Sequence, residues 1–295
     1  MEHSKKHEVC PVCESAQLDT HMQVKDWMIT QELFTIQKCI SCGFHFTNPI
    51  PSEETIGSYY KSEEYVSHSS TNKGLVNKLY NTVRTITLNR KVSLIRKYAK
   101  GKNVLDIGAG TGHFLNACNL AGLHVQGLEP DQDARNFAQA NFGLQLESLD
   151  VLSTMDSNSK DIVTMWHVLE HVYHLKRDIS EILRVLKDNG TLFIAVPNMN
   201  SYDAKKYKEY WAAYDVPRHL YHFQENTIKN LFSQFNMECI TVLPMKFDSY
   251  YVSMLSEKYK GGNILKAFFT GWISNLNSTT NGYSSQIYVF QKKSE

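Results

Sequence analysis

A glycine-rich turn directly after a short apolar run is the feature that most limits the folds open to this chain. The run at 103–107 reads Asn-Val-Leu-Asp-Ile, and Gly108, Gly110 and Gly112 follow it at alternate positions. An apolar run that ends in glycines is typical of a buried strand, and glycine lets the backbone turn sharply and a ligand come close. In parallel sheets, ligands bind at the carboxyl ends of the strands. The turn therefore predicts a site for a nucleotide-type cofactor.

From residue 101 onward, strand-like and helix-like segments alternate, which is typical of a parallel sheet with crossover helices. Strands are expected over 103–107, 124–129, 144–149, 161–166, 191–196, 238–243 and 285–291, and helices over 111–120, 131–141, 176–187 and 226–235. Residues 246–282 are longer than a simple crossover requires, so an extra helix or a lid is expected there.

The residues around the turn distinguish between cofactors. A dinucleotide fingerprint spaces its glycines as Gly-x-Gly-x-x-Gly and places a pyrophosphate at the helix N-terminus. Here the third glycine comes one residue early, and Asp106 precedes the first. A carboxylate repels a pyrophosphate but attracts a cation, and S-adenosylmethionine carries a sulfonium and an ammonium and no phosphate. Glu129 is placed to accept hydrogen bonds from both ribose hydroxyls, and Asp150 from the adenine amino group.

Residues 104–112 resemble the first motif of class I methyltransferases, and Glu129-Pro130 resembles the acidic motif that follows it. The segment 166–172 is similar to the loop after the fourth strand in a subgroup that includes ubiquinone-biosynthesis O-methyltransferases and many glycan-cluster enzymes. The resemblance implies an α/β, Rossmann-like, seven-stranded and mostly parallel sheet with an antiparallel last strand. It also implies S-adenosylmethionine as cofactor, bound by Asp106, Gly108, Ala109, Gly110, Gly112, Phe114, Glu129, Pro130, Asp150, Trp166 and His167. The alternative is a glycine turn that binds nothing.

Two Cys-x-x-Cys pairs lie near the N-terminus, Cys10 with Cys13 and Cys39 with Cys42. In a chain without an export signal, such pairs indicate a metal site rather than disulfides. Two pairs complete a tetrahedral sulfur site, which predicts a structural Zn²⁺ with no open position for catalysis. Redox-active pairs are the alternative. We therefore expect a zinc ribbon over 1–48, similar to the N-terminal ribbon of several sugar and glycan methyltransferases.

The charge balance argues against a nucleic-acid partner. The net charge of the 295 residues is +1, and residues 1–48 hold four Lys against six Asp and Glu. Zinc with four thiolates adds negative charge, and such a surface repels phosphates. No run approaches the roughly 18 apolar residues of a transmembrane helix, and the N-terminus does not resemble a signal peptide, so a cytoplasmic location is expected.

Residues 49–100 are expected to form a helical cap or linker before a methyltransferase domain over 101–295. The pattern Asn48-Pro49-x-Pro51 followed by Tyr59-Tyr60 resembles the family's cap over the cofactor. Tyr60 and Tyr65 are candidates for substrate contact, with aromatic packing between modules as the alternative. Residues 73–102 hold nine Lys or Arg and no acid, with apolar residues at helical spacing. This basic helix is either a solvated face or a contact for an anionic partner such as a nucleotide-linked sugar, an acidic glycan, a membrane surface or RNA.

Methyl transfer is an in-line displacement at a carbon that the sulfonium activates, so the enzyme must align the acceptor and remove its proton. His219 is the first candidate for the base, because a neutral imidazole titrates near the working pH. Asp215 or Arg218 is expected to orient it or to hold the substrate. The segment 215–223 resembles the Asp-x-Pro-Arg-His-Leu-x-x-Phe motif of the same subgroup. His171 is a second candidate base, a ligand for a divalent metal as in the quinone O-methyltransferases it resembles, or part of a helix cap. Substrate contacts are expected from Trp211, Arg218, Tyr221 and His222, unless these residues hold a lid together.

These features predict a methyltransferase that acts on a small-molecule or glycan-type acceptor, either neutral or anionic, by O-methylation with a histidine as general base. A sugar C-methyltransferase is one alternative, but the chain has no room after its last core strand for the third domain of the ribbon-bearing enzymes of that kind. An RNA methyltransferase whose ribbon reads RNA is another. A binding protein that kept the cofactor fold without the activity is the last.

Overall fold

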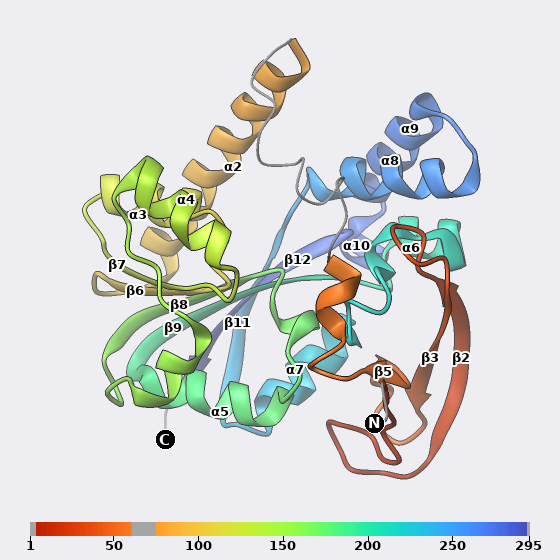
Figure 1. Ribbon diagram of the computed structural model, residues 1–295, viewed down its shortest axis with the longest axis horizontal. Helices are drawn as coiled ribbons and strands as arrows, with labels where there is room; N and C mark the ends of the chain where they lie inside the picture. The colour runs from red at the N-terminus through yellow and green to blue at the C-terminus, as the bar shows by residue number, and fades with distance from the viewer. Residues whose placement is uncertain (1–3, 61–74, 294–295) are drawn as a thin grey trace.

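The computed structural model describes residues 4–60 and 75–293. At its centre lies one sheet of six strands in the order β11-β12-β9-β8-β6-β7 (Figure 1). The strands are β6 (Asn103–Ile107), β7 (His124–Leu128), β8 (Lys160–Trp166), β9 (Leu186–Pro197), β11 (Met237–Pro244) and β12 (Ser285–Lys292). The strands β6 to β9 run parallel, and β12 lies antiparallel between β9 and β11. The predicted fold class, with its antiparallel last strand, is confirmed.

Helices cover both faces of this sheet. Over one face lie α2 (Leu75–Tyr98), α3 (His113–Leu120) and α4 (Gln132–Phe142), and under the other lie α5 (Leu175–Val185) and α7 (Glu225–Ser233) (Figure 1). A sheet buried on both faces requires strands that are apolar at nearly every position. The strand β9 meets this requirement, since Leu192, Phe193, Ile194, Ala195 and Val196 are all fully buried.

Two predicted elements differ from the structure. The strand expected over 144–149 is reduced to a single bridge between Glu147 and Leu128, because the chain turns at once into a 3-10 helix, Leu149–Thr154. The described sheet therefore has six strands and not seven. The helix expected over 176–187 ends at Val185, and the next strand begins directly at Leu186, where it pairs with Lys160.

The N-terminal residues form a second sheet in the order β10-β4-β3-β2, made of β2 (Leu18–Lys25), β3 (Leu33–Cys39), β4 (His45–Thr47) and β10 (Tyr221–His222). A small pair, β1 (Ser4–Lys5) with β5 (Ile50–Pro51), lies beside it. The strand β10 comes from the middle of the chain and pairs with β4 through Tyr221 opposite Phe46 and His222 opposite His45. The N-terminal sheet is thus completed by the segment that the sequence marks as catalytic.

Between β11 and β12 the chain forms three helices, α8 (Asp248–Lys260), α9 (Ile264–Leu276) and α10 (Ser278–Asn281). The expectation of extra helices over 246–282 is confirmed. The helices α8 and α9 form an antiparallel hairpin at one edge of the molecule (Figure 1), and α6 (Tyr202–Tyr207) packs against both of them.

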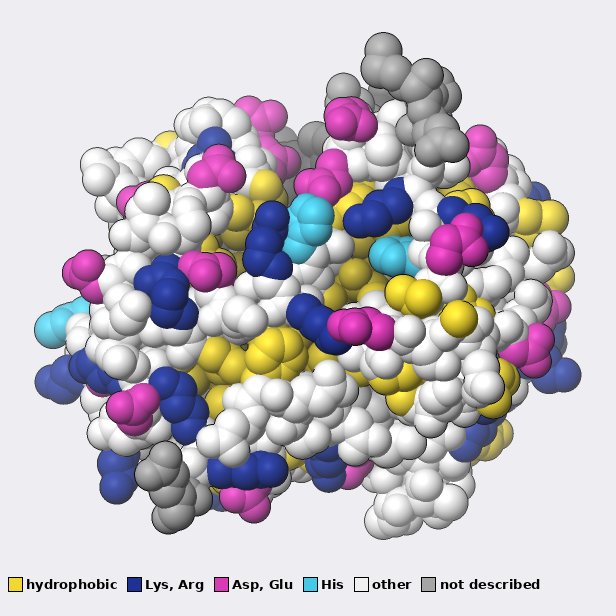
Figure 2. All heavy atoms as spheres, turned by 90° about the horizontal axis from the view of Figure 1, so that it is seen from below, with side chains coloured by type: hydrophobic (Ala, Val, Ile, Leu, Met, Phe, Trp, Pro, Cys, Tyr) yellow, Lys and Arg dark blue, Asp and Glu magenta, His cyan; other side chains and the backbone are white. Residues whose placement is uncertain are grey.

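None of the helices in residues 4–60 and 75–293 combines the length and the apolarity that crossing a bilayer requires. On the face that Figure 2 shows, basic and acidic side chains are interspersed, and neither sign forms a continuous patch.

Candidate active site

The glycine turn joins β6 to α3, and its three glycines have different reasons to be glycine. All three have positive φ, +69° at Gly108, +53° at Gly110 and +78° at Gly112. A Cβ on Gly108 would lie 2.4 Å from a methyl of Val168, and one on Gly112 would lie 2.9 Å from the Cβ of Ala138. A Cβ on Gly110 would meet no atom of the described part of the chain within 4 Å. The backbone at Gly110 therefore faces open space that a ligand can fill, whereas its two neighbours are glycines for packing.

Two buried carboxylates flank this open space. Glu129, at the end of β7, accepts hydrogen bonds from the backbone N–H of Gly110 (2.7 Å) and of Asp131 (3.0 Å), so its carboxylate is fixed at the turn. Asp106 is 1% exposed and accepts a hydrogen bond from the Thr164 hydroxyl at 2.5 Å. Burial raises the pKa of both carboxyls. A cationic ligand beside Asp106 would favour its ionised form.

Trp166 and His167, which end β8, extend the site. The ring of Trp166 packs edge-on against Phe114 of α3, and its buried indole N–H finds no hydrogen-bond partner in residues 4–60 and 75–293. The ring nitrogens of His167 lie 3.2 Å from Glu170 Oε1 and 3.0 Å from Asp248 Oδ2. Burial alone would lower the pKa of His167, but hydrogen bonds to the two carboxylates raise it to about 10. His167 is therefore an imidazolium at neutral pH and cannot serve as a base.

Three further side chains meet just beyond this point. Glu170, His171 and His219 each offer a ligand atom, and these atoms lie within 4.8 Å of one another. The rings of the two histidines contact edge to face at 4.6 Å between centroids. Glu170 is completely buried, and its Oε2 has no hydrogen-bond partner among the described residues. The cluster lies beside the glycine turn, because Val168, two residues before Glu170, is the side chain that covers Gly108.

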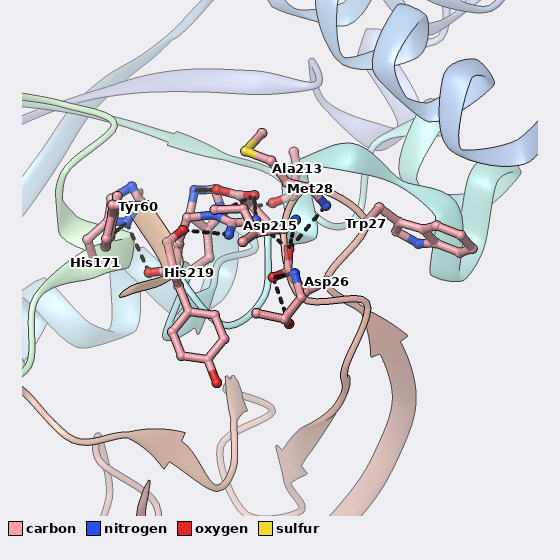
Figure 3. A network of polar contacts seen from close by, with 12 residues as sticks. Asp26, Trp27, Met28, Tyr60, His171, Ala213, Asp215 and His219 are labelled. Atoms are coloured by element: carbon pink, nitrogen blue, oxygen red, sulfur yellow. Dashed lines mark hydrogen bonds and ion pairs between the residues drawn. The ribbon is translucent and has the colours of Figure 1, made fainter. Parts of the chain in front are cut away.

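The hydrogen bonds of the two histidines determine which nitrogen is free (Figure 3). His219 Nδ1 lies 2.9 Å from the carbonyl oxygen of Ala213, and His171 Nδ1 lies 3.0 Å from that of Arg218. A carbonyl only accepts, so both Nδ1 atoms carry the proton and both Nε2 atoms present a lone pair. The Tyr60 hydroxyl also lies 3.0 Å from His171 Nδ1. Burial lowers the pKa of His171 to about 4, with a further contribution from His219, so His171 is neutral at pH 7.

Arg218 joins three parts of the chain. Its guanidinium donates to Asp215 Oδ1 (2.6 and 3.0 Å), to Asp26 Oδ1 (2.9 Å) and to the carbonyl oxygen of Tyr59 (2.9 Å). Arg218 is 1% exposed. Because Asp26 follows β2 and Asp215 precedes His219, these hydrogen bonds of the guanidinium join the N-terminal sheet to the segment of His219. Asp215 Oδ2 lies 3.9 Å from His219 Nε2.

Other predicted site residues lie elsewhere. The indole of Trp211 donates to the buried carboxylate of Asp203 in α6 at 2.7 Å. Tyr221 and His222 form β10, and His222 Nε2 lies 3.0 Å from the Thr47 hydroxyl. Among the predicted cofactor residues, Ala109 is buried in the turn, Pro130 is exposed after Glu129, and Asp150 is exposed on the 3-10 helix after the bridge. Tyr65 lies outside the described residues.

Three residues of the site were not predicted from the sequence. Lys91 of α2 places its ammonium 4.1 Å from the centre of the Trp166 ring, and burial lowers its pKa while Asp106 and Asp248 oppose that effect. The only signal for Lys91 was its place in the basic stretch 73–102. Asp248 and Asp26 lie 81 and 192 residues from the partners they bind, His167 and Arg218. No local pattern marks such pairs.

The four paired cysteines of the N-terminal sheet converge on one point. Cys10 Sγ lies 3.6 Å from Cys42 Sγ, Cys13 Sγ lies 3.5 Å from Cys39 Sγ, and all four sulfurs lie within 4.8 Å of one another. Zn–S bonds of about 2.3 Å in a tetrahedron place the sulfurs about 3.8 Å apart. The arrangement is compatible with a structural zinc ion, and the four thiols leave no ligand position for a substrate.

The sequence pattern of the methyltransferase-domain family matches residues 84–242, more than half of the chain. The ubiquinone biosynthesis O-methyltransferase of Coxiella burnetii is 33% identical over 129 residues, which are 41% of this chain and 53% of that protein. The chain thus spans about half the length of the curated relatives it matches.

Solved structures share the fold. A structure from Galdieria sulphuraria, provisionally assigned as a sarcosine dimethylglycine methyltransferase, superposes with a TM-score of 0.50 at 12% identity and covers 72% of this chain and 86% of its own. A SAM-dependent methyltransferase from Archaeoglobus fulgidus gives a TM-score of 0.49 at 20% identity and covers 71% of this chain and 94% of its own.

With the fold, the glycine turn and the family match in place, the chain belongs to the class I, S-adenosylmethionine-dependent methyltransferases. The residues at the turn fit this cofactor. The space at Gly110 is open, and the fixed carboxylate of Glu129 lies beside it. A second carboxylate, that of Asp106, lies near the end of β6.

Proposed function

We propose that this protein methylates a hydroxyl oxygen of a small-molecule or glycan-type acceptor and that His219 removes the hydroxyl proton. The observation that carries the proposal is the hydrogen bond from His219 Nδ1 to the carbonyl of Ala213, which leaves Nε2 free as a proton acceptor. The methyl group comes from S-adenosylmethionine, whose sulfonium activates it. The chain's own task is to hold the acceptor in line and to accept its proton.

Charged groups lie close to the imidazolium that His219 becomes when it accepts the proton. When Nε2 takes the proton, it lies 3.9 Å from the carboxylate of Asp215. Glu170 contributes a second negative charge, since hydrogen bonding to His167 lowers its pKa against the effect of burial. His171 is neutral at pH 7 and does not repel the new imidazolium. Positioned acid–base groups of this kind contribute about 10²–10⁴-fold to rate.

A cavity of about 420 Å³ supports a small acceptor with an anionic group. It lies between α2 and the start of α8, and its wall includes Arg90, Lys91 and Lys246 together with apolar side chains such as Leu94 and Phe247. The basic side chains suit a carboxylate or phosphate, and the apolar ones suit a ring or an alkyl chain. Asp248 lines the same cavity and binds His167, which in turn binds Glu170 of the cluster.

A divalent cation at the cluster is a second mechanism, supported by the unpartnered Glu170 Oε2. Glu170, His171 and His219 would hold the ion, and it would lower the pKa of an acceptor hydroxyl bound to it. The test adds Mg²⁺ to enzyme that has been stripped of metal and then reloaded with zinc. A rise in turnover of at least tenfold favours this mechanism over His219 acting alone as the base.

The test measures release of S-adenosylhomocysteine with a panel of hydroxylated acceptors (catechols, hydroxybenzoates and monosaccharides). His219→Asn should lower turnover about 10²–10⁴-fold while S-adenosylhomocysteine still binds. His174→Asn is the matched control, because His174 is a partly exposed histidine outside the cluster, and its Nε2 lies 2.9 Å from Glu53 Oε1. Unchanged turnover of His219→Asn would exclude the proposed base, and methylation of amine or carbon acceptors alone would exclude O-methylation.

A further inference from the structure

The helix α9 exposes its large apolar side chains and buries its small ones. Ala267, Thr270, Gly271 and Ser274, at helical spacing, are fully buried against the rest of the protein. On the opposite face the side chains are between 47% and 69% exposed, and they are Ile264, Leu265, Phe268, Phe269, Trp272 and Leu276. A helix on the surface of a globular protein normally has the reverse arrangement.

The inner face of α9 is fixed, so the apolar face cannot turn inward. The hydroxyl of Ser274 donates to Asp203 Oδ1 at 2.6 Å, and the ammonium of Lys206 donates to the hydroxyl of Thr270 at 2.8 Å. A Cβ on Gly271 would lie 2.9 Å from the Cα of Tyr250, so the backbones of α8 and α9 touch at this point. Rotation of the helix would break these contacts and leave Asp203 without a partner for one oxygen.

The charges beside this face indicate what covers it. Residues 258–284 include Lys258, Lys260 and Lys266 and no Asp or Glu. Arg90 of the basic helix α2 lies 5.6 Å from the ring of Phe247 at the base of the hairpin. Phe, Trp and Leu on one face with lysines around them are typical of helices that lie in the interface of an anionic bilayer. A second copy of this chain would bring the same lysines together.

We infer that the apolar face of α9 (Ile264, Leu265, Phe268, Phe269, Trp272 and Leu276) docks the enzyme on an anionic lipid bilayer. The helix lies along the surface, because its 13 residues span only about 20 Å. Lys260 and Lys266 contact the headgroups while the aromatic rings enter the acyl boundary. The cavity between α2 and the start of α8 then lies at the base of the docked hairpin, because Phe247 and Asp248 line it.

The test is flotation of the zinc-loaded full chain with vesicles of phosphatidylglycerol and phosphatidylcholine. The wild-type protein should float with these vesicles and bind pure phosphatidylcholine at least tenfold more weakly, since each Lys near an anionic surface contributes roughly a factor of five. Phe268→Ser with Trp272→Ser should weaken binding about 100-fold, about tenfold for each inserted ring. Leu120→Ser with Leu33→Ser is the matched control, because both side chains are exposed apolar residues outside the hairpin. These changes should leave flotation unchanged.

A fluorescence measurement separates insertion of α9 from a general attraction. The chain has four tryptophans, and Trp272 alone lies on this face. Vesicles should shift the emission of the wild-type protein to shorter wavelength, and Trp272→Phe should remove that shift while it retains flotation. Folded protein that does not float, or the double variant floating as well as wild type, overturns the inference. A concentration-dependent dimer that the same variant disperses would assign the face to a second copy instead.

Discussion

Removal of the Arg218 guanidinium should cost this protein about 3 kcal/mol of unfolding free energy. The side chain is 1% exposed, and it makes four hydrogen bonds to Asp215, Asp26 and the Tyr59 carbonyl. Loss of one partner of a buried ion pair typically costs 3–5 kcal/mol, because the remaining charge stays buried and uncompensated. We expect Arg218→Met to lie at the lower end of this range.

The lower value follows from the partners that remain. Asp26 keeps hydrogen bonds from three backbone N–H groups of residues 28–30 and from the Thr30 hydroxyl. The side chain of Asp215 is 20% exposed, so water can solvate it in part. Arg218→Lys retains the charge but cannot reproduce the fork of donors, and a loss of about 2 kcal/mol is expected.

The assay is urea unfolding followed by tryptophan fluorescence. With a slope of about 3 kcal/mol per molar urea, Arg218→Met should lower the midpoint by about 1 M. Arg177→Met is the control, because Arg177 forms an exposed ion pair with Asp178 at 3.0 Å, and a change of less than about 0.5 kcal/mol is expected. Combined with Asp26→Asn, Arg218→Met should show a coupling energy of about 1–2 kcal/mol. A coupling below about 0.5 kcal/mol would refute the reasoning, since it would mean that the N-terminal sheet is not joined to the methyltransferase fold through this pair.

Three further predictions concern metal, cofactor and acid. Removal of zinc by a chelator, or Cys39→Ser, should lower both the melting temperature and the turnover, because β4 of the N-terminal sheet pairs with β10 next to His219. Metal analysis should give one zinc per chain in the wild type and in the control Cys239→Ala. A normal melting temperature in zinc-free protein would contradict this prediction. Burial raises the pKa of Asp106, so calorimetry should show S-adenosylhomocysteine binding more tightly as pH rises and the carboxylate forms. Asp106→Asn should bind the ligand weakly, and its affinity should not increase with pH. The same pH profile of affinity in both proteins would remove Asp106 from the cofactor site. Burial lowers the pKa of His45 to about 3, so its contribution to stability is present above pH 6.5 and is lost as pH falls below that value. Between pH 7 and 5, His45→Phe should lose about 2 kcal/mol less unfolding free energy than the wild type. An equal loss of unfolding free energy in both proteins would show that His45 is not held neutral.

The sequence by itself determined the elements whose cause is local. The glycine turn, the strand before it and Glu129 follow from short-range patterns, because each strand buried on both faces is apolar and each sharp turn needs glycine. The paired cysteines were equally readable, since their spacing is the geometry of the metal site. The third predicted strand was wrong because only one residue of it, Glu147, meets a partner, and pairing is decided between segments.

Only the tertiary structure decided which polar residues meet. Arg218, Tyr221 and His222 were predicted at the substrate, but Arg218 is enclosed by Asp215 and Asp26, and the other two complete the N-terminal sheet. Asp248 contacts His167, and Glu170 lies beside His171 and His219. These contacts form because the sheet brings the ends of distant strands to one edge. Likewise, only the packing of α9 showed that its large apolar side chains face outward. Contacts between residues far apart in the chain depend on how the layers assemble, which no local pattern encodes.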